Sequence, residues 1–399
     1  MSRIDDATVR QPQRLQPIRA LTRLGHLPVP QFLARYWQRR PLLIRQALPG
    51  FESPFEPDTL FELCARDEVE SRLIERADRR WRLRHGPFGR RGIPPLKRPG
   101  WTLLLQGADH HLAAAADLLA RFRFVPDARL DDLMVSYASD RGGVGPHIDS
   151  YDVFLLQAAG KRRWRIECKP DPTLVPDLPI GLLAHFRPEQ EWLLEPGDLL
   201  YLPPGIAHDG AAIGACMTFS IGFRTPSWPD LAGIWAELQA ERNPHRPASL
   251  RDAVSTAAAH PARLPSRMVE QAHRQLLNRQ PRRHEVALAL LRHLSEPKPR
   301  VSFEPPARPI SRSAFADAIA RRGLRVDPRT RMLYSNRTLA INGELESLQD
   351  SSHRAWMRSL ADRRVMSAQH DVHSQCAVPG RTLIRLYEWY RAGWVHPHI

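Results

Sequence analysis

The stretch that decides the fold is Gly142-Gly143-Val144-Gly145-Pro146-His147-Ile148-Asp149, where a glycine-rich turn runs into two potential metal ligands. His147 and Asp149 stand two positions apart, and residues with this spacing on a β-strand project from the same face. Both side chains can therefore reach one metal ion. The sequence predicts that this turn and strand lie at the mouth of a small β-barrel.

A third ligand candidate follows farther along the chain. An apolar strand pattern at 199–202 leads into the turn Pro203-Pro204-Gly205 and then to His208, which is 59 positions beyond Asp149. Two histidines and one carboxylate bind one face of Fe(II) and leave the other positions open for oxygen and a co-substrate. A lone His-x-Asp is weak support in a chain with 17 histidines. The strand and turn context of all three residues favours a catalytic metal site made of His147, Asp149 and His208.

The next candidate is a cation for a co-substrate. An iron site of this kind needs an electron-donating co-substrate, and 2-oxoglutarate requires a cation for its far carboxylate. Along the predicted strand 162–168, Arg162 shares a face with Trp164 and Ile166, both expected in the core. A buried guanidinium needs an anionic partner to offset its desolvation. Arg162 is thus the inward candidate, whereas a solvated basic edge is the alternative. Ser136 is expected either to give the co-substrate a hydroxyl contact or only to line the pocket.

The 399 residues suffice for two or three domains. Residues 1–26 are expected to form a basic disordered leader. Residues 27–225 alternate short strands with turns, a pattern typical of a sandwich or jelly-roll barrel. The predicted strands are 132–138, 151–158, 162–168, 191–195, 198–202 and 217–223, and the predicted helices are 30–39, 57–66 and 109–122. Asp109 is expected to cap the last helix, and we prefer this interpretation to a second metal site at Asp109-His110-His111.

The remainder of the chain reads mainly as helix. Residues 226–296 carry apolar side chains at helical spacing, with helices expected at 231–242, 250–259, 266–277 and 284–294. Residues 297–399 begin with a proline-rich linker. A helix at 312–322, a hairpin formed by 324–326 with 332–334, and helices at 352–363 and 381–390 then indicate a winged-helix module.

Composition limits the partners and the compartment. A formal net charge of +15 predicts attraction to polyanions, although an arginine-rich genome would bias composition in the same way. The four cysteines are scattered and show no metal or redox spacing, as expected for a reduced cytosolic protein. No run of about 18 apolar residues is present, so we expect no membrane span.

Taken together, these motifs resemble those of a known family, the bacterial JmjC-type ribosomal oxygenases, specifically the arginine hydroxylases acting on protein sixteen of the large ribosomal subunit. The resemblance is carried by residues 101–106, 131–136, 142–154, 160–165, 196–204 and 220–224. It implies an α+β chain with a double-stranded β-helix (cupin or jelly-roll, JmjC) barrel, a helical dimerisation region and a C-terminal winged-helix domain.

The resemblance also implies an activity. The family's iron ligands fall on His147, Asp149 and His208, and its 2-oxoglutarate contacts fall on Arg162 and Ser136. Fe(II), 2-oxoglutarate and O2 would then serve hydroxylation of the β-carbon of an arginine in a large-subunit (50S) ribosomal protein. A cytoplasmic homodimer is expected, with direct nucleic-acid binding not required. Acidic or aromatic side chains at the barrel mouth should hold the substrate, and the candidates are Tyr137, Asp140 and Tyr151.

Three alternatives remain open at the level of sequence. The first is a JmjC-type hydroxylase of another protein or of RNA, which would share the barrel and differ at its mouth. The second is a non-catalytic winged-helix regulator that binds nucleic acid, although the C-terminal module offers no clear basic recognition helix and carries Glu344, Glu346 and Asp350. The third is a metal-dependent cupin isomerase or storage cupin, which would not need a buried cation at Arg162.

Overall fold

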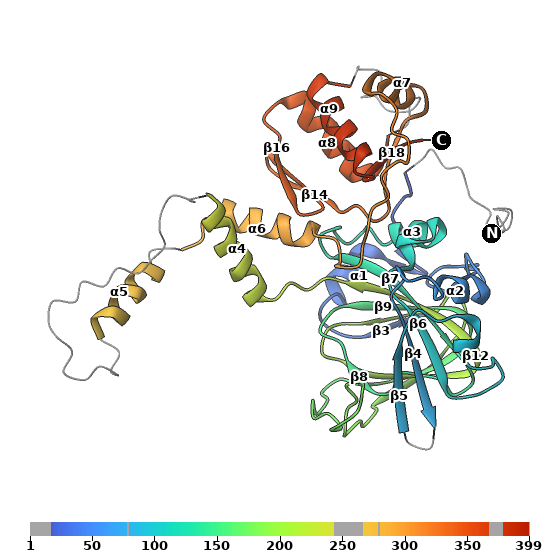
Figure 1. Cartoon of the computed structure of the whole chain (residues 1–399). Coiled ribbons are helices and arrows are strands. Elements are labelled where there is room, and N and C mark those ends of the chain that lie inside the picture. The colour runs from blue at the N-terminus through green and yellow to red at the C-terminus, as the bar shows by residue number, and fades with distance from the viewer. Residues whose placement is uncertain (1–16, 78–79, 243–265, 278–279, 367–377, 399) are drawn as a thin grey trace.

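The computed structural model describes residues 17–77, 80–242, 266–277, 280–366 and 378–398 (Figure 1). Its main body is a ten-stranded antiparallel sheet in the order β3-β11-β9-β12-β7-β6-β4-β5, with β10 beside β9 and β8 beside β12. The sheet forms the double-stranded β-helix barrel that the strand pattern predicts. Its strands are β3 (Leu42–Ile44), β4 (Ser71–Ala77), β5 (Arg80–His85), β6 (Trp101–Leu105), β7 (Leu130–Ala138), β8 (His147–Ile148), β9 (Val153–Glu167), β10 (Gln190–Leu194), β11 (Leu199–Leu202) and β12 (Ala207–Phe223).

Short helices and one small hairpin accompany the barrel. They are the hairpin β1 (Arg23–Leu24) and β2 (Leu27–Pro28), the helices α1 (Val29–Arg35), α2 (Pro57–Leu63) and α3 (Ala113–Ala120), and the single 3-10 turns η1 (Arg90–Gly92) and η2 (Ala108–His110). Proline in the first turn starts both α1 and α2, where its fixed φ and missing N–H cost nothing.

An aromatic cluster fills the barrel core beside the candidate metal motif. The fully buried Phe154 ring lies 5.4 Å from Phe32 and 5.2 Å from Tyr201, measured between ring centroids. The Tyr201 hydroxyl donates to Asp152 over 2.6 Å, and Arg129 pairs with the same carboxylate at 3.1 Å. Because Asp152 is fully buried, these contacts fix the chain three residues beyond Asp149.

Several sequence predictions within the barrel need correction. The segments 151–158 and 162–168 form one strand, β9, because Gly160 (φ +63°) lets the backbone bend where the register with β12 shifts. Asp109 does not cap a helix: α3 starts after Leu112, and the Asp109 carboxylate instead accepts from the backbone N–H of Leu133 over 2.9 Å. The hydrogen bond to a neighbouring strand outcompetes the local cap.

The helical region forms an arm that extends sideways from the barrel (Figure 1). It contains α4 (Trp228–Arg242), α5 (Ser266–Leu277) and α6 (Arg283–Ser295). Helices α4 and α6 pack together, and Arg292 of α6 pairs with Glu241 of α4 at 2.8 Å. The helix predicted at 250–259 lies outside the described residues.

The C-terminal module sits above the barrel in Figure 1. It consists of α7 (Arg312–Arg322), β13 (Leu324–Val326), β14 (Met332–Ser335), β15 (Thr338–Ile341), β16 (Glu344–Ser347), α8 (Ser351–Arg363), β17 (Val365–Met366), α9 (Gly380–Arg391) and β18 (Val395–Pro397). The winged-helix prediction is confirmed, but its hairpin was wrong. Strand β13 pairs with β17 and β18, whereas β14 pairs with β15. The turn Asn336-Arg337, with Asn336 at positive φ, closes the true hairpin.

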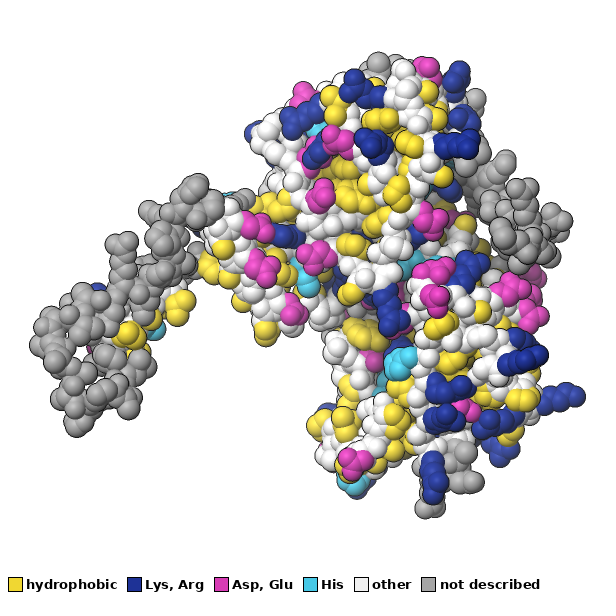
Figure 2. All heavy atoms as spheres, viewed as in Figure 1, with side chains coloured by type: hydrophobic (Ala, Val, Ile, Leu, Met, Phe, Trp, Pro, Cys, Tyr) yellow, Lys and Arg dark blue, Asp and Glu magenta, His cyan; other side chains and the backbone are white. Residues whose placement is uncertain are grey.

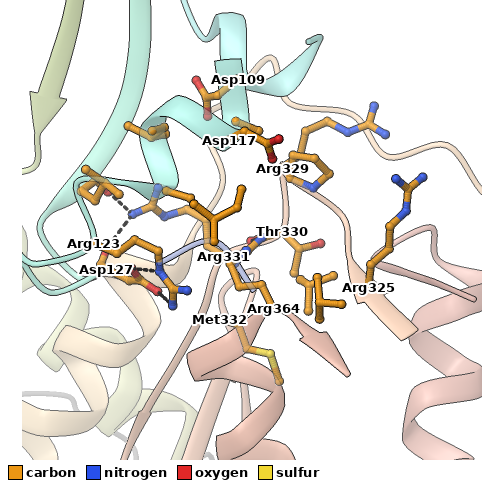
Figure 3. A pocket seen from close by; sticks show the side chains of 18 of the residues that line it. Asp109, Asp117, Arg123, Asp127, Arg325, Arg329, Thr330, Arg331, Met332 and Arg364 are labelled. Carbon is orange, nitrogen blue, oxygen red and sulfur yellow. Dashed lines mark hydrogen bonds and ion pairs between the residues drawn. The ribbon is translucent and has the colours of Figure 1, made fainter. Parts of the chain in front are cut away.

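Arginines join the winged helix to the barrel through backbone carbonyls (Figure 3). Arg331 donates to the carbonyls of Asp127, Leu130 and Asp131 over 2.7 to 3.2 Å, and also to Leu294 at 3.1 Å. Burial lowers the pKa of Arg331 to about 10. In the opposite direction, Arg123 of the barrel donates to carbonyls at the end of α8. The two modules are therefore tied together by directional hydrogen bonds.

None of the helices in the described part of the chain has the length and apolar character that spanning a bilayer requires.

Candidate functional site

Two of the three predicted ligands lie on adjacent strands of the barrel, and Asp149 follows directly after β8. His147 in β8 is the direct register partner of His208 in β12. The turn before β8 depends on Gly145, whose φ of +79° suits glycine and where a Cβ would collide with Leu182 and press on the Trp81 ring. A larger residue at position 145 would therefore distort the turn that positions His147.

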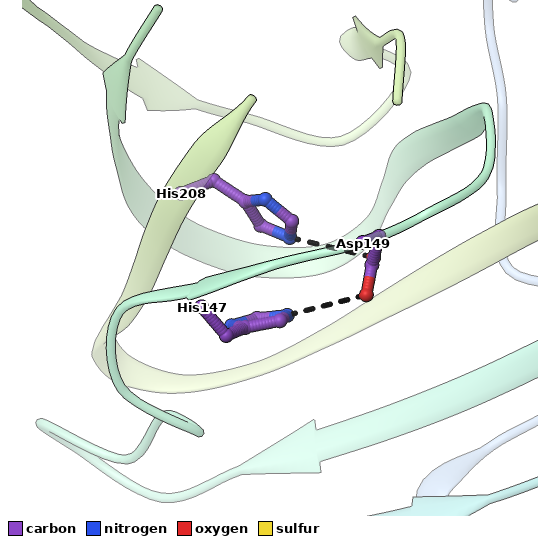
Figure 4. A group of neighbouring side chains, drawn as sticks. All are labelled: His147, Asp149 and His208. Atoms are coloured by element: carbon purple, nitrogen blue, oxygen red, sulfur yellow. Dashed lines mark ion pairs between the residues drawn. The ribbon is translucent and has the colours of Figure 1, made fainter. Parts of the chain in front are cut away.

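The side chains of His147, Asp149 and His208 converge (Figure 4). Each offers one ligand atom, and these atoms all lie within 4.8 Å of one another. The Asp149 carboxylate oxygens are 3.9 Å from Nε2 of His147 and 3.7 Å from Nε2 of His208. These separations exceed a good hydrogen bond, but they suit three atoms sharing one small cation.

Backbone carbonyls fix which ring nitrogens face the site. Nδ1 of His147 lies 2.9 Å from the Gly145 carbonyl, and Nδ1 of His208 lies 3.1 Å from the Ile206 carbonyl. A carbonyl only accepts, so both Nδ1 atoms carry the proton and both Nε2 lone pairs point toward Asp149. This second contact on each imidazole is typical of metal-binding histidines.

Burial sets the charge state of the ligands. It lowers the pKa of His208 to about 3, with the neighbouring His147 adding to the effect. His208 is therefore neutral, as a metal ligand must be. Burial also raises the pKa of Asp149, which His147 and a hydrogen bond from Tyr151 oppose. A cation between the three side chains would remove the penalty on the carboxylate.

A buried cation lies deeper in the barrel, as strand parity predicts. Arg162 is 4% exposed, and Trp164 and Ile166 on the same face of β9 are also buried. Its Nη1 donates to Ser136 Oγ at 3.0 Å and to Thr218 Oγ1 at 3.2 Å. Among the described residues Arg162 has no carboxylate partner, and its Nε is buried without a hydrogen bond. An unpaired buried guanidinium is costly, which makes this pocket receptive to an anion.

Trp164 spans the interval between the two parts of the site. Its ring centroid is 5.8 Å from the His208 ring, and the Arg162 guanidinium carbon lies 5.3 Å from the indole. Gly210 makes room for the indole, because a Cβ there would fall 2.7 Å from its ring. The Trp164 indole therefore lies against both His208 of the candidate metal site and the buried Arg162.

Sequence reasoning missed Thr218, a direct partner of Arg162, and Gln157, the partner of Thr218. Thr218 faces Ser136 across β12 and β7 and donates to Gln157 Oε1 at 3.0 Å. Only the strand register brings Ser136, Thr218 and Gln157 together, and nothing in the local sequence signals it. Ser136 orients the guanidinium, while its contact with a co-substrate stays a prediction.

The candidates for the barrel mouth separate in the structure. Tyr137 lies in the core, with its ring 5.4 Å from Trp101. Asp140, in the turn after β7, accepts from the backbone N–H of Gly214 in β12. Tyr151 is 40% exposed and contacts Asp149. Of the three, Tyr151 is the one in contact with a ligand candidate.

A cavity of about 430 Å³ lies elsewhere, between the barrel and the winged helix (Figure 3). Its lining includes Asp109, Arg123, Asp127, Arg331 and Arg364, whereas the three ligand candidates do not line it. The cavity belongs to the junction between the two modules.

Comparison with known proteins relates both modules to characterised families. The JmjC domain family matches residues 117–231, the ROXA-like winged helix matches residues 272–396, and the AraC-like ligand binding domain matches residues 183–294.

Two curated bacterial relatives align with about half of the chain. The chain is 40% identical over 220 residues to the ribosomal protein uL16 3-hydroxylase of Escherichia coli and 35% identical over 215 residues to a probable ribosomal oxygenase of Haemophilus influenzae. These alignments cover 53% and 52% of this chain, and 57% and 52% of the relatives' own lengths.

A solved structure extends the similarity to nearly the whole chain. The Escherichia coli ribosomal oxygenase YcfD, in complex with cobalt and 2-oxoglutarate, superposes with a TM-score of 0.79 at 30% identity. The match covers 94% of this chain and 99% of that one.

Proposed function

The chain belongs to the JmjC-type ribosomal oxygenase family, and from this premise we propose that it is an Fe(II)- and 2-oxoglutarate-dependent oxygenase. Its substrate would be a large-subunit ribosomal protein, hydroxylated at the β-carbon of an arginine. The curated relatives are aligned over about half their lengths, and the Escherichia coli relative is named for 3-hydroxylation of uL16. That name supports the substrate assignment.

The observation that carries the proposal is the buried Arg162, which has no carboxylate partner among the described residues and lies on the same ribbon of strands as the converging ligand candidates. Two imidazoles and one carboxylate are the ligand set of non-haem Fe(II) oxygenases, and they leave positions for a chelating co-substrate. A dicarboxylate that reaches from this site to Arg162 would supply the guanidinium with its missing partner. We therefore assign iron to His147, Asp149 and His208, and 2-oxoglutarate to Arg162 and Ser136.

The chain's own residues would perform three tasks. Iron and 2-oxoglutarate, when bound with O2, supply the oxidising power, which leaves succinate and carbon dioxide as co-products. The carbonyls of Gly145 and Ile206 hold the imidazoles in the metal-binding tautomer. Arg162 orients the co-substrate by its far carboxylate. The buried Trp164 keeps water away from the space between metal and guanidinium.

The assembly and location proposed from the sequence are consistent with this role. We propose a cytoplasmic homodimer that pairs through the helical region, and we retain the domain boundaries 27–225, 226–296 and 297–399. The predicted disordered leader 1–26 needs correction at its end, because Arg23 and Leu24 form β1 and Leu24 is buried in the barrel core. Trp228 at the start of α4 is 85% exposed and Leu276 in α5 is 72% exposed. Apolar side chains this exposed on two helices of the same region support a role for the region in pairing.

The test is to incubate the purified protein with Fe(II), 2-oxoglutarate and peptides from large-subunit ribosomal proteins. We expect a mass gain of one oxygen atom on an arginine, located at the β-carbon by fragmentation. His208→Ala serves as the inactive control. No gain on any such peptide, with normal 2-oxoglutarate binding, would overturn the substrate and point to another protein or to RNA.

A further inference from the structure

Positive charge gathers on the hairpin β4–β5 and on the connection that follows it. Figure 2 shows dark-blue side chains clustered over the lower part of the barrel, where Figure 1 places β4 and β5. The cations are Arg72, Arg76, Arg80, Arg82, Arg84, Arg90, Arg91, Lys97 and Arg98. Among the described residues of 71–100 the acid is Glu75, which is buried. Asp78 and Arg79 lie outside the described residues.

Glu75 neutralises only the inner part of this cluster. It pairs with Arg98 at 3.1 Å and with Arg84 at 3.6 Å. The other exposed cations form no ion pair with any described residue. We call them the basic surface, and they are Arg76, Arg80, Arg82, Arg90, Arg91 and Lys97.

Two of these arginines are held in place by aromatic rings. The Arg90 guanidinium lies 5.0 Å from the Phe61 ring centroid, and the Arg76 guanidinium lies 5.4 Å from that of Trp81. Stacking limits the rotamers of a long side chain while leaving its N–H groups free. Binding of a partner would therefore cost these arginines less side-chain entropy than binding to arginines without such support.

Protection of a sheet edge explains part of the cluster but not all of it. Strand β5 is the last strand of the sheet, and charged side chains on an edge strand prevent pairing with another chain. That need accounts for Arg80 and Arg82. It does not account for Arg91 and Lys97, which lie in the connection between β5 and β6, where no strand edge needs protection.

The chemistry of the surface fits phosphate groups. All members except Lys97 are arginines, whose planar guanidinium binds phosphate through two parallel hydrogen bonds. The exposed large apolar residue of the stretch is Leu96, and its exposed ring is the imidazole of His85, with no exposed Phe, Tyr or Trp among the described residues. One imidazole is a small stacking platform, so contact with the sugar–phosphate backbone is favoured over readout of single-stranded bases.

The surface also adjoins the candidate iron site. Trp81 lies between Arg80 and Arg82 on β5, so its side chain leaves the opposite face of the strand. There the indole packs against Gly145, two residues before His147. Arg76 stacks on this indole, so the basic surface reaches both faces of the hairpin, with Arg80 and Arg82 on one face and Arg76 beside Trp81 and Gly145 on the other.

We propose that the basic surface binds the phosphate backbone of helical RNA and so holds RNA beside the barrel mouth. The choice of RNA over DNA rests on the proposed function, because a ribosomal protein is assembled on RNA. The binding itself requires neither iron nor 2-oxoglutarate, so it is tested independently of the oxygenase activity.

The experiment measures fluorescence anisotropy of a labelled RNA duplex of mixed sequence, with the full chain at several salt concentrations. The test variant is Arg80→Gln/Arg82→Gln/Arg91→Gln/Lys97→Gln. The matched control removes four exposed arginines from the winged helix: Arg312→Gln/Arg321→Gln/Arg322→Gln/Arg381→Gln. We expect the test variant to lose at least about tenfold in affinity, with a shallower salt dependence, and the control to change less than about threefold.

Other outcomes overturn the proposal. Equal losses in both variants would indicate attraction by net charge alone, and loss in the control only would move the site to the winged helix. Equal affinity for a DNA duplex would remove the RNA assignment, and displacement by polyglutamate at equal charge would indicate an acidic protein partner. Thermal unfolding checks folding, and the loop pair Arg91→Gln/Lys97→Gln, expected to lose about threefold, repeats the test without altering β5.

Discussion

Removal of the buried guanidinium should have opposite effects on co-substrate binding and on stability. In Arg162→Met the far carboxylate of 2-oxoglutarate would be buried without its partner, at a cost of about 3 to 5 kcal/mol. Since about 1.4 kcal/mol is a factor of ten, the dissociation constant should rise by about a hundredfold to a few thousandfold. Without co-substrate the substitution removes an unpaired buried charge, so the free energy of unfolding should not fall.

Calorimetric titration of 2-oxoglutarate into the Co(II)-loaded protein without oxygen measures the first effect, and thermal unfolding of the metal-free protein measures the second. Arg163→Met is the matched control, because Arg163 is the exposed neighbour on the same strand. It should bind like the parent chain. If Arg162→Met binds 2-oxoglutarate within about threefold of the parent, Arg162 does not hold the far carboxylate of 2-oxoglutarate.

Three further predictions concern other parts of the molecule. His208→Ala removes one of three converging ligand atoms, and Co(II) affinity, followed by absorbance, should fall at least about a hundredfold; retention of tight binding would contradict the site. Burial would raise the pKa of Asp327, but hydrogen bonds from His396 and Arg329 outweigh it and hold this pKa below its usual range. The ionised Asp327 therefore stabilises the folded state at pH values above its unfolded pKa of about 3.9. This stabilisation is lost as the pH falls through the lower pKa that Asp327 has in the folded state. Asp327→Asn should lower the unfolding midpoint at pH 7 and approach the parent in acid, whereas a pH-independent difference would argue against the ion pair. Arg331→Met leaves several buried carbonyls unpaired and should cost about 3 to 5 kcal/mol in denaturant unfolding; an unchanged midpoint would show that these bonds do not hold the modules together.

Local sequence patterns were sufficient where one element carries the whole signal. Strand parity placed Arg162 on the buried face with Trp164, since alternation needs no knowledge of the neighbouring strands. The spacing of His147 and Asp149, followed by a turn before His208, likewise identified side chains that the structure brings together. Helix periodicity located α7, α8 and α9 to within a residue or two.

Features that depend on pairing between distant segments could not be predicted from local sequence patterns. The partners of Arg162 include Thr218, which register alone brings beside Ser136. The wing of the C-terminal module was mispaired because β13 and β14 are close in sequence, while β13 finds its partners beyond α8. Asp109 shows the same competition, as its carboxylate satisfies a strand N–H in place of a helix end.

The hydrogen-bonded ribbon of β9 and β12 carries both ends of the candidate site. His208 faces Ile166 across this ribbon, and Arg162 faces Ala212. Ile166 lies four positions beyond Arg162 in β9, which is about 13 Å of backbone at about 3.3 Å per residue. The distance from metal to guanidinium is thereby set by strand geometry and not by a movable loop. A diacid that bridges the ligand candidates and the Arg162 guanidinium would therefore have to match a length fixed by the two strands.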